Sequence, residues 1–124
     1  MENSLESIKT LGFKEAGKWE LDKDGKITSE LTDNKITAEN VVYAFIADEK
    51  VMYVGKTSRT LEARMQNYRN CDKTQEVNVR VSEEIKKILE SGGNVLIYAM
   101  PNGDLEPQLI KGLSPEWNKQ GVSK

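Results

Sequence analysis

Apolar residues concentrate in two short segments near the middle of the chain. Residues 41–46 read Val-Val-Tyr-Ala-Phe-Ile, which is β-branched and aromatic and apolar on both faces, and this pattern predicts a central strand. Residues 51–54 read Val-Met-Tyr-Val and predict a second strand. The short gap between them predicts an antiparallel hairpin, and we expect a three-residue loop formed by Asp48, Glu49 and Lys50.

The loop length matters because each central strand carries one tyrosine. Tyr43 and Tyr53 share a face of the sheet only if the loop is odd or a bulge interrupts the pairing. A two-residue loop over Asp48 and Glu49 would by itself put them on opposite faces. An isolated strand tyrosine is more often a packing residue than a functional one.

The remaining elements follow from weaker patterns. In the polar N-terminal third, Asp24-Gly25 separates two alternating segments and predicts a hairpin, because glycine tolerates positive φ. One helix is expected from a cap at Ser58 to about Tyr68, and a second from Ser82 to the glycines at 92–93. A strand at 94–100 and a short helix capped by Asp104 complete the order.

This order predicts an α/β (α+β) fold in which a small three-stranded antiparallel sheet is flanked by helices and carries an N-terminal β-hairpin extension. The length of 124 residues indicates one domain. We expect a polar extension at 1–39, the main domain at 40–119 and a tail at 120–124.

Composition narrows the chemistry. The chain has no histidine and one cysteine, which excludes Ser-His-Asp and Cys-His catalysis, histidine-ligated zinc and a disulfide framework. An enzyme with this composition must move protons with Tyr, Lys, Asp or Glu. No apolar run approaches the roughly 20 residues that cross a bilayer, and the N-terminus does not read as a secretory signal, so we expect no membrane contact and a cytoplasmic protein.

Charge is unevenly distributed. The formal net charge is −2, which by itself disfavours nucleic-acid binding. Residues 51–80, however, hold six basic and three acidic side chains, a local charge of +3. A local basic field suits a phosphate backbone, whereas a solvated helix face is the ordinary alternative.

Five short segments between about residues 40 and 119 resemble the GIY-YIG nucleases, and in particular the small phage endonuclease II branch of that family. The matching segments are Val41-Val42-Tyr43, Tyr53-Val54-Gly55, Leu61-Glu62-Ala63-Arg64, Leu105-Glu106-Pro107 and Pro115-Glu116-Trp117-Asn118. The resemblance implies a metal-dependent DNA endonuclease of phage or prophage origin. The first motif glycine is replaced by Val41, which leaves open an inactive relative.

The resemblance implies a role for each matched residue. Tyr43 would act as general base with Tyr53 beside it, and Lys56 is the sequence candidate to lower the tyrosine pKa, which is ordinarily about 10. Arg64 would stabilise the phosphorus transition state. Glu106 would hold one Mg²⁺, with Mn²⁺ as an alternative, although a glutamate in a first helical turn is also favourable without a metal.

Asn118 would orient Glu106 or a tyrosine, or serve as an ordinary turn asparagine. Gly55 would let a phosphate approach the backbone or simply form a helix-entry turn. Arg59, Arg69, Lys73 and Arg80 are the candidates for DNA backbone contacts.

Two rival functions remain open at this stage: a nucleic-acid-binding module that does not cut, and a protein-interaction domain. A nuclease should bring Tyr43, Tyr53, Arg64 and Glu106 to one concave surface, whereas an interaction domain should leave Arg64 and Glu106 apart. Cutting both strands with one site per chain would need a homo-oligomer or two encounters.

Overall fold

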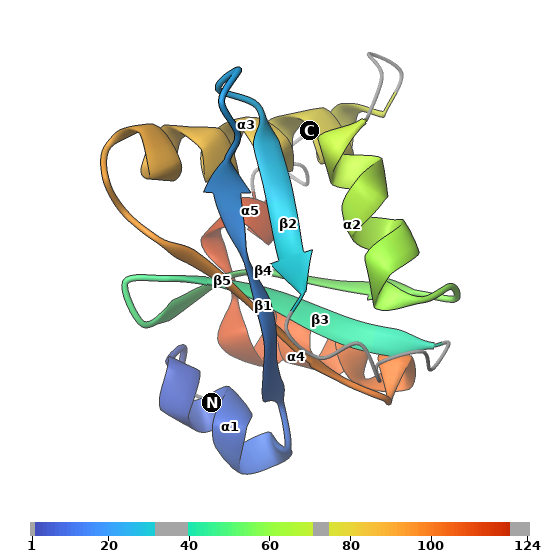
Figure 1. The fold of residues 1–124 in the computed structure, drawn as a ribbon. Coiled ribbons are helices and arrows are strands. Elements are labelled where there is room, and N and C mark those ends of the chain that lie inside the picture. Colours follow the sequence, from blue (N-terminus) through green and yellow to red (C-terminus); the bar gives the residue numbers. More distant parts are fainter. Residues whose placement is uncertain (1, 32–39, 71–74, 120–124) are drawn as a thin grey trace.

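The computed structural model describes residues 2–31, 40–70 and 75–119, which form a mixed α/β fold (Figure 1). The elements in chain order are α1 (Leu5–Leu11), β1 (Lys14–Leu21), β2 (Ile27–Leu31), β3 (Val41–Ala47), β4 (Lys50–Thr57), α2 (Leu61–Arg69), α3 (Glu76–Glu90), β5 (Val95–Met100), the 3₁₀ turn η1 (Gly103–Leu105), α4 (Glu106–Leu113) and α5 (Glu116–Lys119). No helix in these ranges is long and apolar enough to cross a membrane.

The strands form one antiparallel sheet in the order β2-β1-β5-β3-β4. The α/β class and the N-terminal hairpin predicted from the sequence are confirmed, but the sheet has five strands rather than three. The hairpin is not an extension, because Lys14 to Trp19 of β1 pair with β5. The sequence could not show this pairing, since it joins segments about 80 residues apart in the chain.

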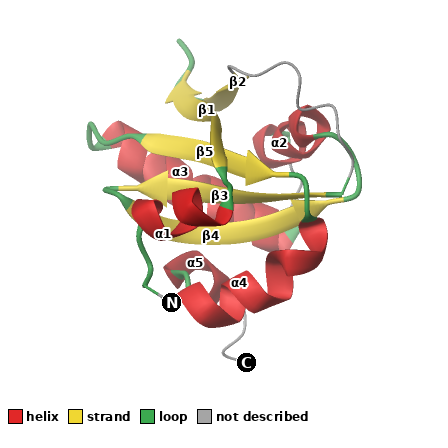
Figure 2. Cartoon of the chain, turned by 90° about the horizontal axis from the view of Figure 1, so that it is seen from below, coloured by secondary structure: helices red, strands yellow, loops and turns green. Residues whose placement is uncertain are grey.

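The two faces of the sheet are buried under different helices. Alternation along β3 sends Val41, Tyr43 and Phe45 to one core and Val42, Ala44 and Ile46 to the other. The first core is closed by residues of α2, α3 and α5, and the second by residues of α1 and α4. Figure 2 shows helices on both sides of the strands. A strand with both faces covered explains the unbroken apolar run at 41–46.

The β3–β4 connection differs from the expected loop. Ala47 pairs with Lys50, so the loop has two residues, Asp48 and Glu49, both with positive φ, at 54° and 61°. The three-residue prediction is therefore wrong. A register shift between the Phe45–Tyr53 and Ile46–Val51 pairs inserts one extra residue into β4, and this bulge returns Tyr53 to the face of Tyr43.

Four helix starts also differ from the expectations. α4 follows Leu105 without a side-chain cap, so the cap expected at Asp104 is wrong. α1 was missed, although Ser4 caps it and Gly12 ends it with φ of 116°. α2 is capped by Thr60 rather than Ser58. α3 begins at Glu76 rather than at Ser82, whose hydroxyl instead donates to the carbonyl of Val79 within the helix.

Candidate active site

Three aromatic side chains from β3 and β4 form the floor of the candidate site. Tyr43 and Phe45 follow each other on one face of β3, and Tyr53 lies beside them on β4. The ring centroids are 5.4 Å apart for Tyr43 and Phe45, 5.8 Å for Phe45 and Tyr53, and 6.4 Å for Tyr43 and Tyr53. Tyr43 has no exposed surface, whereas 8% of Tyr53 is exposed. The two motif tyrosines are therefore neighbours in one layer, with different access to solvent.

A third tyrosine, Tyr68, closes this layer from α2. Its hydroxyl oxygen lies 2.6 Å from that of Tyr43, and its ring is edge-on to those of Tyr43, Phe45 and Tyr53. From the sequence, Tyr68 was expected only as the last residue of a helix. The available signal was its spacing, because residues four apart on a helix share a face and Tyr68 follows Arg64 by four.

Arg64 is fixed by three hydrogen bonds. Its Nε donates to the Tyr43 hydroxyl at 3.0 Å, and one terminal nitrogen, Nη2, donates to the Tyr68 hydroxyl at 3.1 Å and to Oδ1 of Asn78 at 3.0 Å. The guanidinium carbon also lies 4.5 Å from the centre of the Tyr68 ring, a cation–π distance. The structure thus brings together three of the predicted site residues, Tyr43, Tyr53 and Arg64.

The protonation of Tyr43 differs from the expectation. Burial raises the pKa of Tyr43 above its ordinary value, and the nearby Arg64 charge only partly opposes this effect. Lys56 was expected to lower that pKa. It is exposed, it pairs with Val42 and therefore lies on the opposite face of the sheet, and it is not among the groups that shift the pKa of Tyr43. Burial likewise raises the pKa of Tyr68.

These raised pKa values predict a loss of stability at alkaline pH. Below about pH 10 both tyrosines are protonated in the folded and unfolded states, so their contribution to the free energy of unfolding is fully present. Above about pH 10 the unfolded chain releases the tyrosine protons that the folded chain retains, and stability falls. Each tyrosine should then lower the free energy of unfolding by up to about 1.4 kcal/mol per pH unit. Urea unfolding between pH 9 and 11 measures this slope, which should be shallower in Tyr43→Phe. An identical slope in that variant would contradict the prediction.

Gly55 provides space for the Tyr43 ring. The two residues pair across β3 and β4, and a Cβ at Gly55 would lie 2.5 Å from the Tyr43 hydroxyl oxygen and 2.6 Å from Cζ. Gly55 lies inside β4, which continues to Thr57, so it does not form the expected helix-entry turn. A glycine at this position is explained by close packing of the tyrosine on the strand beside it.

Gly55→Ala should therefore destabilise the protein. The added methyl overlaps a ring that is fully buried and hydrogen-bonded, and overpacking of this kind costs about 1–3 kcal/mol. Chemical denaturation measures the change. An unchanged free energy of unfolding would mean that the Tyr43 ring can shift without cost and that its close contact with Gly55 does not affect stability.

Asn118 holds the backbone of the second motif strand. Its Oδ1 accepts a hydrogen bond from the Val54 N–H at 2.8 Å, and its Nδ2 donates to the Val54 carbonyl at 3.0 Å. β4 is an edge strand, so these bonds satisfy groups that no further strand can pair. Val54 lies between Tyr53 and Gly55, and Asn118 therefore fixes the strand segment that carries both.

Glu106 is half-buried and opens α4. The η1 turn just before it is attached to the start of β3, because the Gly103 N–H donates to the Asn40 carbonyl at 2.9 Å. Figure 1 shows the N-terminal ends of α2 and α4 at the same end of the β3–β4 pair. The described contacts do not join Glu106 to Arg64 or to the tyrosines, and in these ranges no three acidic or cysteine side chains gather as a metal site.

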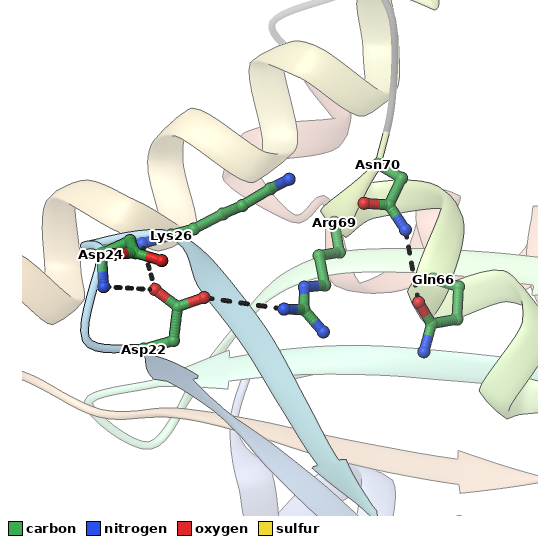
Figure 3. Close-up of polar contacts among 6 residues, drawn as sticks. All are labelled: Asp22, Asp24, Lys26, Gln66, Arg69 and Asn70. Carbon is green, nitrogen blue, oxygen red and sulfur yellow. Dashed lines mark hydrogen bonds and ion pairs between the residues drawn. The ribbon is translucent and has the colours of Figure 1, made fainter.

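The predicted DNA-contact residues occupy different environments. Arg59 is exposed just before α2, whereas Arg80 is half-buried and donates to the Trp117 carbonyl at 3.2 Å. Arg69 lies 3.6 Å from Asp22 of the β1–β2 turn (Figure 3). Lys73 lies outside the described residues.

Comparison with known proteins places this arrangement in a family. No family model matches the chain. Endonuclease II of Enterobacteria phage T4 is 31% identical over 126 residues, which cover 85% of this chain and 88% of that protein.

Two solved structures share the fold. A glutamate-to-alanine mutant of bacteriophage T4 EndoII superimposes with a TM-score of 0.75 at 27% identity over 93% of this chain and 98% of that one. The restriction endonuclease HPY188I, solved with product DNA, gives 0.58 at 17% identity over 80% of this chain and 61% of that one. The identity to the phage protein over nearly the full length of both sequences is decisive, and the chain belongs to the endonuclease II family.

Proposed function

We propose that the protein is a DNA endonuclease of the GIY-YIG type that hydrolyses phosphodiester bonds with a tyrosine, Arg64 and one Mg²⁺ ion. The observation that carries this proposal is the fixed position of Arg64 over the tyrosine layer, because its hydrogen bonds leave one terminal nitrogen available for a phosphate. Membership of the endonuclease II family supports the same activity.

Arg64 suits the phosphoryl-transfer step. A guanidinium stays charged near neutral pH, and with Nε and Nη2 already bonded, Nη1 keeps two N–H groups that can donate to phosphate oxygens. Its side chain is half-buried, and charge stabilisation is stronger in such a setting than in water. Held against Tyr43 and Tyr68, the group needs little reorganisation when the phosphorus becomes five-coordinate.

Tyr43 and Tyr53 have different proposed roles. Tyr43 has no exposed surface and is covered by Arg64 and Tyr68, so in this conformation it anchors Arg64 rather than meeting a water molecule. Tyr53 retains exposed surface and is the better-placed tyrosine to accept the proton of an attacking water. This reverses the roles expected from the resemblance alone, in which Tyr43 was the base.

Glu106 is the proposed metal ligand. Mg²⁺ is commonly held by one or two carboxylates with water and substrate phosphate as the other ligands, so the single half-buried carboxylate at the start of α4 can serve as the protein ligand. The ion would supply charge stabilisation for the leaving 3′ oxygen. One site cuts one strand, and double-strand cleavage would require a homo-oligomer or two encounters.

The test is cleavage of supercoiled plasmid by the purified protein in Mg²⁺, in Mn²⁺ and in EDTA. Nicked or linear product that requires the divalent ion is the expected result. Salt-sensitive DNA binding without cleavage would instead support a binding module that does not cut DNA. The sequence feature that favours this alternative is Val41, which replaces the first glycine of the motif. Absence of both binding and cleavage would contradict the nucleic-acid function altogether.

A further inference from the structure

A buried amide on α3 contacts the candidate site. Asn78 lies in the first turn of α3 and is 8% exposed, and among the described residues only Thr57 is a comparably buried polar side chain. Polar groups are seldom buried without a partner, because burial removes their hydrogen bonds to water. The partner here is Arg64, whose Nη2 donates to Asn78 Oδ1 at 3.0 Å.

The hydrogen bonds of Arg64 fix its orientation as well as its position. Nη2 uses its two N–H groups on Tyr68 and Asn78, and Nε uses its one on Tyr43. Three acceptors around a planar group define the plane of that group. Nη1 has no partner among the described residues and is not one of the buried polar atoms that lack one, so it is the nitrogen that meets solvent.

The three acceptors are not equivalent. Tyr43 and Tyr68 both lie on the tyrosine layer beneath the guanidinium, and their hydroxyls are already bonded to each other. Asn78 comes from a different helix, and it supplies the acceptor that stops the guanidinium from rotating about its contact with that layer. Without it, Nη2 would lose one of its two partners, and the direction of Nη1 would be held less firmly by the bonds to Tyr43 and Tyr68 alone.

We propose that Asn78 is a positioning residue for DNA cleavage: its side-chain carbonyl holds the Arg64 guanidinium so that Nη1 points at the scissile phosphate. This inference rests on the proposed function. It concerns orientation, so it predicts a loss in kcat with little change in KM, since DNA affinity comes mainly from other backbone contacts.

Two substitutions separate orientation from packing. Asn78→Leu keeps a similar volume but removes the acceptor, and it should lower kcat about 10- to 100-fold. Asn78→Asp keeps an acceptor oxygen for the guanidinium but adds a negative charge near the phosphate, so it should lose clearly less kcat than Asn78→Leu. Equal losses in both variants, or an unchanged kcat in Asn78→Leu, would overturn the proposal.

Asn3→Ala is the matched control for lost stability. The Asn3 amide is partly buried and bonds the N–H and carbonyl of Val51 and the carbonyl of Leu113, close to the second core and not to the tyrosine layer. Its loss should lower the thermal midpoint without lowering kcat at a temperature where the variant is folded. A kcat loss equal to that of Asn78→Leu would show that the effect is general destabilisation.

A second readout does not depend on activity. The Arg64 Nε–H is hydrogen-bonded in a half-buried place and should give a slowly exchanging signal in NMR spectra of the ¹⁵N-labelled protein. That signal should weaken in Asn78→Leu and persist in Asn78→Asp. If the wild type fails to cleave DNA while this pattern is observed, the proposed function fails and the positioning contact stands. If cleavage is normal and the signal is unchanged in Asn78→Leu, the positioning role alone is wrong.

Discussion

Arg64→Ala is expected to lower the rate of plasmid cleavage by about 10²- to 10³-fold, the range found when one charge-stabilising donor is removed from a transition state. The guanidinium is the cation that the structure holds against the tyrosine layer, with Nη1 free to meet a phosphate. Initial rates over a range of DNA concentrations would show the loss in kcat.

Arg64→Lys tests whether geometry or charge matters. A lysine keeps the positive charge but cannot bind three acceptors in one plane, so most of the loss should remain. Lys9→Ala, on exposed α1 at the opposite face of the sheet, controls for removal of one positive charge. Near wild-type cleavage by Arg64→Ala, with the protein folded by circular dichroism, would remove Arg64 from the mechanism.

Glu106→Gln is the second large effect, and it should lower the rate of Mg²⁺-dependent cleavage by about 10²- to 10³-fold. A metal contributes several kcal/mol of charge stabilisation, and each 1.4 kcal/mol corresponds to about tenfold in rate. Glutamine keeps the size of the side chain but is a much weaker ligand for a hard cation. A titration with Mg²⁺ should show whether high concentrations of the ion restore part of the rate.

Glu116→Gln is the matched control for Glu106→Gln. Both glutamates are in the first turn of a short helix, α4 or α5, where a negative charge favours the helix by about 0.3–1 kcal/mol. Loss of that contribution should be common to both variants, whereas loss of cleavage should be confined to Glu106→Gln. Equal activity losses would indicate a helix effect and would argue against Glu106 as the metal ligand.

Much of this molecule follows from local sequence. The apolar run at 41–46, the Asp-Gly turn and the strand near residues 95–100 can each be recognised from local sequence. For β3 the reason is that both of its faces pack against buried cores, which requires apolar side chains at every position. The resemblance to the GIY-YIG nucleases also pointed to Tyr43, Tyr53 and Arg64, and the fold places both Tyr53 and Arg64 against Tyr43.

Other features depended on contacts that no local pattern encodes. The N-terminal hairpin joins the sheet through β5, and the bulge near Tyr53 places the two tyrosines on one face in spite of a two-residue loop. The N-terminal half of α3 was missed because the strong start signal at Ser82 lies inside the helix. Asn78 lies in that half of the helix and was missed with it.

The sequence by itself thus determined the fold class, the central hairpin and which side chains could carry chemistry in a chain without histidine. Only the tertiary structure decided the environment of those side chains. It buried Tyr43 and raised its pKa, placed Lys56 on the other face, and joined Arg64 to Tyr68 and Asn78. The physical reason is that burial and hydrogen-bond partners are set by segments far apart in the chain, and these set a group's protonation and orientation.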